Sequence, residues 1–444
     1  MKLLFKIPFV LLFCVLSRLD AQKFVTIKDG RFKIKNKVYY FVGANFWYAS
    51  YLGLEKSPAR GVDRLRKELD FLKSQNIQNI RVLAAVEGSG KLNGANRVEP
   101  AYQTDAGKFN DANLNGLDIL MDEAGKRNMK VILFLSNNWE WSGGWLQYLI
   151  WNNKIDKIKS AGKLNWDDQR DFTAKFYTCE ECKNQYFEQV RKIITRRNSV
   201  NGKKYTKDKT LMAWEIANEP RPMRPAANED YKKFIAESAA FIKSLDKNHL
   251  VTTGSEGEQG TEDMNLYKEN HADKNIDYLT IHIWPKNWEW FRNDTMEKDF
   301  ESVKKKTSEY IQAHIKIADE LKKPLVLEEF GFPRDGHSFD VSGPTTLRDR
   351  YYESVLELWK ESKNQNGSFQ GCSFWAFNGI ARPIPGQIFW KKGDDYMGDP
   401  PMEEQGLNGV FISDQSTWEI IKKYSEMSNN SIIKIDQNPI KKNK

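Results

Sequence analysis

The chain is 444 residues long and has a formal net charge of +8, with 68 Lys and Arg against 60 Asp and Glu. This modest excess is spread along the sequence without a dense basic block, so the composition does not indicate a nucleic-acid partner. No Pro-, Ser- or Gly-rich linker divides the sequence, and its length suits one large domain with insertions.

Residues 1–21 have the pattern of a secretory signal. Lys2 and Lys6 give a positive start, residues 7–16 are apolar, and Asp20-Ala21 precedes Gln22. We predict cleavage near Ala21, and the alternative is an uncleaved anchor. The apolar run is too short to span a bilayer. The mature protein is therefore expected to be secreted, in the periplasm or outside the cell, without stable membrane insertion.

Strand-like runs alternate with helical patterns along residues 22–427. Between the strands, apolar residues recur at helical spacing, as at Val62, Leu65, Leu69 and Leu72. Apolar strands separated by helices favour a parallel sheet covered by helices, and eight repeats predict a closed (β/α)₈ TIM barrel. The alternative, a doubly wound sheet, lacks its Gly-rich turn after the first strand. The predicted strands span residues 39–47, 77–85, 130–137, 210–218, 250–255, 276–284, 325–330 and 371–377.

We predict that residues 22–427 form a single catalytic domain and that residues 428–444 are a polar, solvated tail. Cys179 and Cys182 could form a local disulfide after export or half of a metal site. No second Cys pair or nearby His completes a zinc site, so no metal is expected there. The chemistry expected below needs no organic cofactor either. Cys372 lies in an apolar run and is expected to be buried.

Two carboxylates follow apolar strand runs. Glu219 lies in the run Trp214-Glu215-Ile216-Ala217-Asn218-Glu219-Pro220-Arg221, and Glu329 lies in Leu325-Val326-Leu327-Glu328-Glu329-Phe330-Gly331. A lone Glu is usually solvated surface, but both of these fall at the C-terminal ends of barrel strands, where active sites gather. Glycosidases need such a pair, one acid to protonate the leaving oxygen and one carboxylate to attack the sugar or activate water.

Polar and aromatic side chains are predicted to converge on the same rim of the barrel. They follow several different strands, which makes their convergence more informative than any single residue. We assign to this rim Arg81, Asn137, Asn218, His282, Trp284, Trp375 and Asn378.

These motifs resemble glycoside hydrolase family 5, and within it the endo-β-1,4-mannanases. The resemblance runs from about residue 24 to residue 418. Its most specific parts are residues 214–221, 282–288, 328–331 and 403–408, together with the Asn137-Asn138-Trp139 run before Gly143-Gly144.

The resemblance implies a role for each matching residue. Glu219 is expected to be the general acid/base, and Glu329 the nucleophile. Glu328 is expected to point away, toward packing or a salt bridge. The remaining implied roles are hydrogen bonding to the sugar 2-hydroxyl by Asn218, support of the nucleophile by Arg81, fixing of the carboxylates by His282 and stacking under the sugar by Trp375.

The other implied sugar contacts are Trp47, Asn137 and Arg221, the last reaching sugars beyond the cleaved bond. Arg221 could instead be a helix-start or surface arginine, and Trp47 and Trp284 could be core residues. Many relatives have Tyr where this chain has Trp284, whose indole offers one N–H donor and a larger face.

The resulting expectation is a monomeric, retaining endo-β-1,4-mannanase that acts on mannan, glucomannan or galactomannan. Glu219 is expected to rest protonated, because burial and the charge of Glu329 raise its pKa, while Glu329 stays ionised beside Arg81. One alternative is an endo-β-1,4-glucanase of the same family. The other is a glycan-binding barrel without catalysis.

Overall fold

The computed structural model describes residues 23–155 and 162–429. Its centre is one parallel sheet of eight strands in the order β12-β11-β10-β5-β4-β15-β14-β13. Backbone hydrogen bonds join the two edges, from Asp277 to Val251 at 2.8 Å and from His282 to Glu256 at 3.1 Å. The predicted (β/α)₈ barrel is therefore confirmed. The strands are β4 Phe41–Asn45, β5 Asn79–Leu83, β10 Lys130–Phe134, β11 Leu211–Glu215, β12 Leu250–Thr252, β13 Leu279–Ile283, β14 Leu325–Phe330 and β15 Phe369–Phe374.

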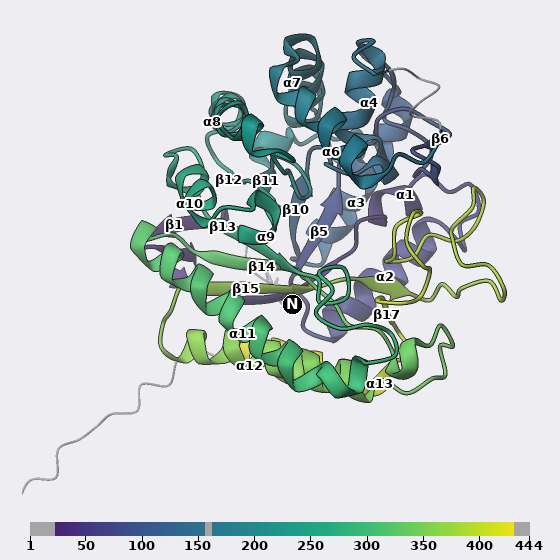
Figure 1. Cartoon of the computed structure of the whole chain (residues 1–444), viewed down its shortest axis with the longest axis vertical. Helices are drawn as coiled ribbons and strands as arrows, with labels where there is room; N and C mark the ends of the chain where they lie inside the picture. The colour runs from purple at the N-terminus through teal and green to yellow at the C-terminus, as the bar shows by residue number, and fades with distance from the viewer. Residues whose placement is uncertain (1–22, 156–161, 430–444) are drawn as a thin grey trace, which may run out of the picture.

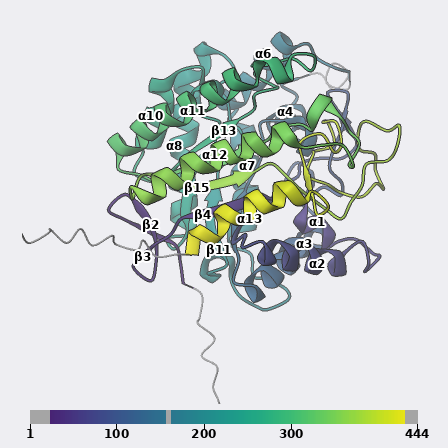
Figure 2. The same cartoon turned by 90° about the horizontal axis from the view of Figure 1, so that it is seen from below.

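Helices form a ring around the strands (Figure 1). Each turns its apolar stripe inward, and in α2 the predicted stripe at Leu65, Leu69 and Leu72 is buried. Figure 2 shows α11, α12 and α13 side by side on one flank of the barrel. The ring contains α2 Val62–Ser74, α3 Asp111–Lys126, α7 Glu180–Ile194, α8 Asn228–Leu245, α10 Met264–Ala272, α11 Met296–Leu321, α12 Thr346–Asn364 and α13 Gln415–Asn429.

Shorter elements lie in the connections between strands and helices. Those that follow the C-terminal ends of strands build the walls of the site described below. The shorter helices are α1 Ala49–Leu52, α4 Gly144–Trp151, α6 Trp166–Ala174 and α9 Glu258–Thr261, with 3₁₀ turns η1 Glu140–Ser142, η2 Lys175–Thr178, η3 Tyr205–Lys207, η4 Pro225–Ala227 and η5 Asp335–His337. The small strand pairs are β6 Lys91–Leu92 with β7 Ala95–Asn96, β8 Gln103–Asp105 with β9 Lys108–Phe109, and β16 Phe377–Gly379 with β17 Val410–Phe411.

The N-terminal end of the barrel is plugged. A small sheet of β1 Thr26–Lys28, β2 Arg31–Ile34 and β3 Lys37–Val38 contributes Val25 and Phe32 to a buried cluster with barrel residues such as Phe41 and Tyr278. Because this end is packed with apolar side chains, the opposite, C-terminal end is the one open to a ligand.

A 40-residue connection, residues 375–414, joins β15 to α13. It is held against α2, because Ile380 donates its N–H to Glu68 at 2.8 Å and Arg64 donates to the carbonyl of Tyr396 at 2.8 Å. The predicted strand at residues 371–377 thus ends at Phe374, and the chain then turns into this long connection.

Cys179 and Cys182 are joined by a disulfide, so they offer no free thiolates to a metal, and Cys372 is buried as predicted. The proposed signal at residues 1–21 lies outside the described residues. Helix α13 continues to Asn429, and the remainder of the proposed tail also lies outside them. Among the described residues, no helix combines the length and the hydrophobicity needed to cross a membrane.

Candidate active site

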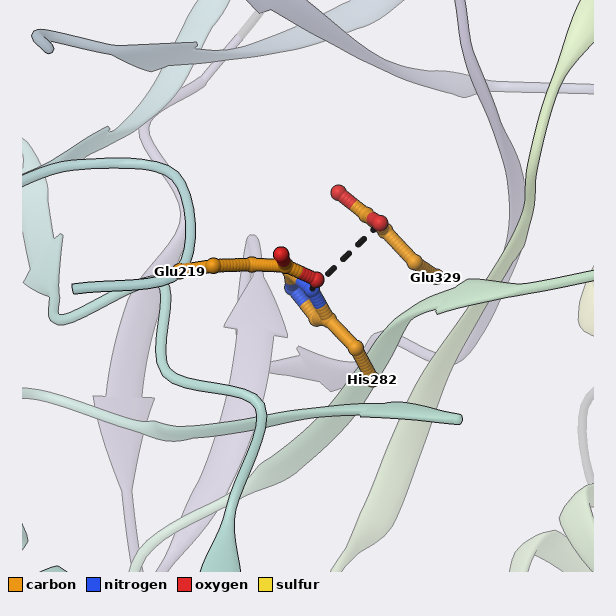
Figure 3. A group of neighbouring side chains, drawn as sticks. All are labelled: Glu219, His282 and Glu329. Carbon is orange, nitrogen blue, oxygen red and sulfur yellow. Dashed lines mark hydrogen bonds and ion pairs between the residues drawn. The ribbon is translucent and has the colours of Figure 1, made fainter. Parts of the chain in front are cut away.

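A cleft of about 480 Å³ opens at the C-terminal end of the barrel, as the strand ends predict. Glu219 and Glu329 both line it. An oxygen of each, together with a ring nitrogen of His282, lies within 4.8 Å of the others. Figure 3 shows the two carboxyl groups pointing into the same space, with His282 reaching between them.

The backbone at Glu219 is shaped to present its side chain. Glu219 follows β11 with φ of +52°, an uncommon conformation for a non-glycine residue. Its N–H donates to the carbonyl of Gly254, beyond the end of β12, at 2.9 Å. A bond to the neighbouring strand therefore fixes this turn.

Glu329 is surrounded by donors. Arg81 Nη1 donates to Oε1 at 2.5 Å and Trp284 Nε1 donates to Oε2 at 3.1 Å, while His282 Nδ1 lies 3.4 Å from Oε2. Burial raises the pKa of Glu329 to about 7, although the charges of His282 and Arg81 oppose this shift. The predicted support of Glu329 by Arg81 is present, and the indole of Trp284 supplies a second N–H donor.

Arg81 is itself held by a buried network. Its guanidinium donates to both carboxylate oxygens of Glu215, at 2.8 and 2.5 Å, and to Oδ1 of Asn218 at 2.8 Å. Bidentate bonds of this kind fix the plane of a guanidinium. Arg81 lies under the cleft wall rather than on it, so it positions Glu329 and does not touch a ligand.

Glu219 has different neighbours. His282 Nδ1 lies 2.7 Å from Oε1, and Trp139 Nε1 donates to Oε2 at 2.5 Å. Burial favours the neutral acid, but the hydrogen bond and charge of His282 and the charge of Arg221 outweigh it, so the pKa of Glu219 lies below its ordinary value. The pKa of His282 rises to about 10, because Glu329 and Glu219 outweigh the effect of burial.

In the free site, Glu329 therefore holds a proton more readily than Glu219 does. This is the reverse of the prediction, in which Glu219 is protonated and Glu329 is ionised. The sequence could not show that His282 is bonded to Glu219 and places its positive charge there. The spacing of Glu219, His282 and Glu329 would also suit a metal ion. However, Nδ1 of His282 is already bonded to Glu219, and Arg81 supplies positive charge to Glu329, so the donors form a hydrogen-bonded acid–base cluster.

Comparison with known proteins agrees with this geometry. A family model described as glycoside hydrolase family 5 β-mannosidase-like matches residues 22–432. The chain belongs to glycoside hydrolase family 5.

The curated relatives of this family 5 glycoside hydrolase include plant proteins. Mannan endo-1,4-β-mannosidase 5 of Solanum lycopersicum is 29% identical over 79% of this chain and 80% of its own. Mannan endo-1,4-β-mannosidase 1 of Oryza sativa subsp. japonica is 28% identical over 85% and 83%.

Solved structures show the same similarity. The family 5 mannosidase of Rhizomucor miehei matches with a TM-score of 0.80 and 30% identity, covering 91% of this chain and 97% of its own. The endo-1,4-β-mannanase of the same organism matches with a TM-score of 0.63 and 22% identity, over 91% and 99%.

Two predicted sugar contacts of this family 5 chain do not line the cleft. Trp47 is 1% exposed and donates its indole N–H to the carbonyl of Gly398 at 2.7 Å, so it anchors the 375–414 connection. Asn137 is fully buried and accepts from Nδ2 of Asn218 at 3.1 Å. Both support the cleft from behind, and neither lines it.

The other predicted contacts occupy the cleft wall, since Asn218, Arg221, Trp284 and Trp375 all line it. Arg221 makes a bidentate ion pair with Glu256, at 2.5 and 2.7 Å, and its guanidinium carbon lies 4.9 Å from the ring centroid of Trp139. The alternative that Arg221 is a surface arginine is therefore wrong. His282, like Arg81, is fully buried and positions the carboxylates from below.

Glu328 is buried and turns toward the barrel interior, as expected for the neighbour of Glu329. Its Oε2 lies 3.9 Å from Arg81 Nε and 3.7 Å from His282 Nε2. The predicted salt bridge is thus present at long range.

Sequence reasoning assigned no role to several residues of the wall. Trp139 could have been found, because it follows the end of a predicted strand. Glu256 could have been found in the same way, since it directly follows the predicted strand at residues 250–255. Glu403 lies in the 403–408 segment of the family resemblance but was given no role. Trp166 could not be found, because it comes from a long connection without a periodic pattern. Burial and the charges of Asp399, Glu329 and Glu219 raise the pKa of Glu403 well above its ordinary value, so the wall includes a further acidic group that tends to keep its proton.

Proposed function

We propose that the protein is a secreted, retaining hydrolase of β-1,4-mannosidic bonds. The observation that carries this proposal is the short separation of Glu219 and Glu329, since an oxygen of one carboxyl group lies within 4.8 Å of an oxygen of the other. Retaining glycosidases hold their carboxyl groups about 5–5.5 Å apart, whereas inverting enzymes need about 6.5–9.5 Å to admit a water molecule.

In the first step, a carboxylate oxygen of Glu329 attacks the anomeric carbon as the bond to the leaving oxygen breaks. Glu219 gives its proton to that oxygen, and a glycosyl ester of Glu329 forms. In the second step, water attacks the anomeric carbon, Glu219 takes a proton from it, and the ester bond to Glu329 breaks. Both carboxyl groups return to their starting states.

The proton for the first step is available from His282. With Glu219 ionised and His282 protonated, transfer across their 2.7 Å contact gives a neutral acid and a neutral imidazole with no change in proton count. A bound sugar excludes water, and a drier site favours this neutral pair over the ion pair. Although Glu219 is ionised in the free site, it can therefore still act as the acid when the sugar is bound.

The substrate assignment is supported by the relatives. The plant relatives are named mannan endo-1,4-β-mannosidases, and one Rhizomucor miehei mannosidase structure is a complex with mannosyl-fructose. We assign a hydrogen bond to the 2-hydroxyl to Asn218, stacking under the sugar to Trp375, and contact with sugars past the cut to Arg221. Secretion is supported by the signal pattern and by the Cys179–Cys182 disulfide, since disulfides persist in oxidising compartments.

Endo action follows the plant relatives, but a second candidate is cleavage at the chain end. It is favoured by the higher TM-score to a structure named mannosidase and by the family model described as β-mannosidase-like. In addition, the 375–414 connection places Pro400, Met402 and Glu403 in the cleft wall, where they narrow the space for a continuing chain.

The test compares sugar release from unsubstituted β-mannan and soluble cellulose by the purified mature chain. The proposal predicts strong release from mannan and little from cellulose. Mixed oligosaccharides as early products indicate endo action, and mannose alone indicates chain-end action. Preference for cellulose would replace the substrate by glucan, and binding without release would leave a non-catalytic barrel. Light scattering of the same sample tests the expected monomer.

A further inference from the structure

Trp166 is the most exposed tryptophan of the cleft wall. It is 47% exposed, whereas Trp141 and Trp375 are each 3% and Trp284 is 8% exposed. Keeping a large apolar face in water forgoes the hydrophobic gain of burying it, and exposed aromatic faces beside a cleft are typical of ligand contacts. None of the roles assigned above uses this residue.

Trp166 continues an aromatic surface that starts at the catalytic pair. Its ring lies nearly parallel to that of Trp139, with centroids 6.2 Å apart and an interplanar angle of 28°. Trp139 in turn donates to Glu219 and lies under the guanidinium of Arg221. Moving away from Glu219, a ligand therefore meets Trp139 and Arg221 first and Trp166 next.

This surface lies on the side of the leaving group. Glu219 protonates the departing oxygen, so the sugars released with that oxygen lie on the side of Glu219. Trp139 is bonded to Glu219, whereas Trp284 is bonded to Glu329 and packs against Trp375 with centroids 6.0 Å apart. Trp166 is thus separated from the sugar that Glu329 attacks.

Helix α6, which begins at Trp166, is fixed to the segment that follows Glu219. Arg170 donates to the carbonyl of Met223 at 2.5 Å and pairs with both oxygens of Glu262 at 2.8 Å. Arg224 pairs with Asp171 at 2.7 Å. These bonds tie the position of Trp166 to that of Glu219, as a binding platform requires.

We propose that Trp166 is a sugar-stacking platform on the leaving-group side, one position beyond the sugar next to Trp139 and Arg221. The pyranose ring has a face of C–H groups, and the flat indole offers a matching apolar surface. The platform gives the enzyme a preference for longer β-1,4-linked chains. It rests on the proposed function for the identity of the sugar.

The test is a chain-length series with Trp166→Ala. We measure kcat/KM for mannobiose through mannohexaose and take the ratio of hexaose to biose. The expected result is a roughly tenfold fall in this ratio relative to the unsubstituted chain, equivalent to about 1.4 kcal/mol. Trp166→Phe, which keeps an aromatic face, is expected to restore most of it.

The matched control is Phe339→Ala, which removes an aromatic side chain that is 38% exposed and does not line the cleft. Its ratio is expected to equal that of the unsubstituted chain. An equal loss on every chain length for Trp166→Ala, or no change in the ratio, overturns the platform.

Binding separates this proposal from the proposed function. In Glu329→Gln, which cannot form the ester, calorimetry compares mannohexaose binding with and without Trp166→Ala. Weaker binding in the double variant supports the platform even if the unsubstituted chain hydrolyses no mannan. Equal binding overturns it even if mannan hydrolysis is strong.

Discussion

Donor placement around Glu329 decides how readily this carboxylate is charged. Arg81 and Trp284 donate N–H groups to it, the positive charge of His282 lies 3.4 Å away, and burial works against all three. Because a hydrogen bond to the charged form lowers a carboxyl pKa, each donor extends the pH range in which Glu329 can attack. With the pKa of Glu329 at about 7, kcat/KM is expected to fall as pH drops below about 7.

Trp284→Phe tests one of these donors. It removes the N–H that lies 3.1 Å from Glu329 and keeps an aromatic ring. Loss of a bond to a charged group is expected to lower kcat/KM by roughly 10- to 100-fold and to move the acidic limb of its pH profile upward. Trp284→Tyr, which offers a hydroxyl donor, is the control. An unchanged acidic limb in Trp284→Phe would contradict this role.

Glu219→Gln tests the acid. On mannan-type substrates, loss of general acid catalysis is expected to lower kcat by roughly 10²- to 10⁴-fold. A dinitrophenyl β-mannoside has a leaving group that needs no proton, so ester formation from it is expected to be affected much less. The comparison is made by burst kinetics with each substrate. Equal losses of the first step would mean that Glu219 does not deliver the proton.

At the scale of elements, the ends of β11 and β12 act as a unit. Gly254 has φ of +78° and accepts the hydrogen bond that holds Glu219. A Cβ at this position would lie 1.9 Å from the carbonyl oxygen of Ala217 and 2.3 Å from Oε1 of Glu215. The close approach of two strand ends therefore requires glycine here, and it places Glu219 next to the buried Arg81 network.

Gly254→Ala is expected to destabilise the fold by at least about 2 kcal/mol, because backbone strain and a clash with main-chain atoms combine. Activity per folded molecule is expected to fall as well, since the turn at Glu219 moves. The control is Gly90→Ala, which has φ of +79° but nothing within 4 Å of the added Cβ. Thermal unfolding and kcat are measured for both. Equal effects of the two substitutions would mean that only the backbone angle matters.

At the scale of the whole molecule, the barrel and the catalytic pair were predictable because both leave local patterns. Each barrel strand is an apolar run, and Glu219 and Glu329 follow such runs. Trp47 and Asn137 were wrongly predicted to contact the sugar. A strand-end pattern does not show whether a side chain lines the cleft or is buried behind the residues that line it. The positions of Trp166 and of the 375–414 connection depend on contacts between segments that are distant in the sequence. Hydrophobic periodicity does not predict such contacts.

The raised pKa of Glu329 also makes the stability of the folded protein depend on pH. A carboxyl whose pKa is raised on folding stabilises the folded state fully below its unfolded pKa, and this contribution disappears as pH rises through the folded pKa. For Glu329 the window runs from pH 4.5 to about 7. The proton that it holds is thus worth roughly 3 kcal/mol at the acidic end.

Glu329→Gln removes this titration while keeping the shape of the side chain. The thermal midpoint of the unsubstituted chain relative to the variant is expected to fall between pH 4.5 and 7 and to level off above. Titrating groups that do not contact Glu329, such as His271 and His314, are present in both proteins and cancel in the difference. A difference that is flat with pH, or that rises, would contradict the raised pKa.

The most direct test of the central claim is the anomeric configuration of the first product, followed by proton NMR as a mannan oligosaccharide is cleaved. The close pairing of Glu219 and Glu329 predicts that the β-anomer of the new reducing end appears first and then mutarotates. Initial appearance of the α-anomer would show inversion and would contradict both the double displacement and the role of Glu329 as nucleophile.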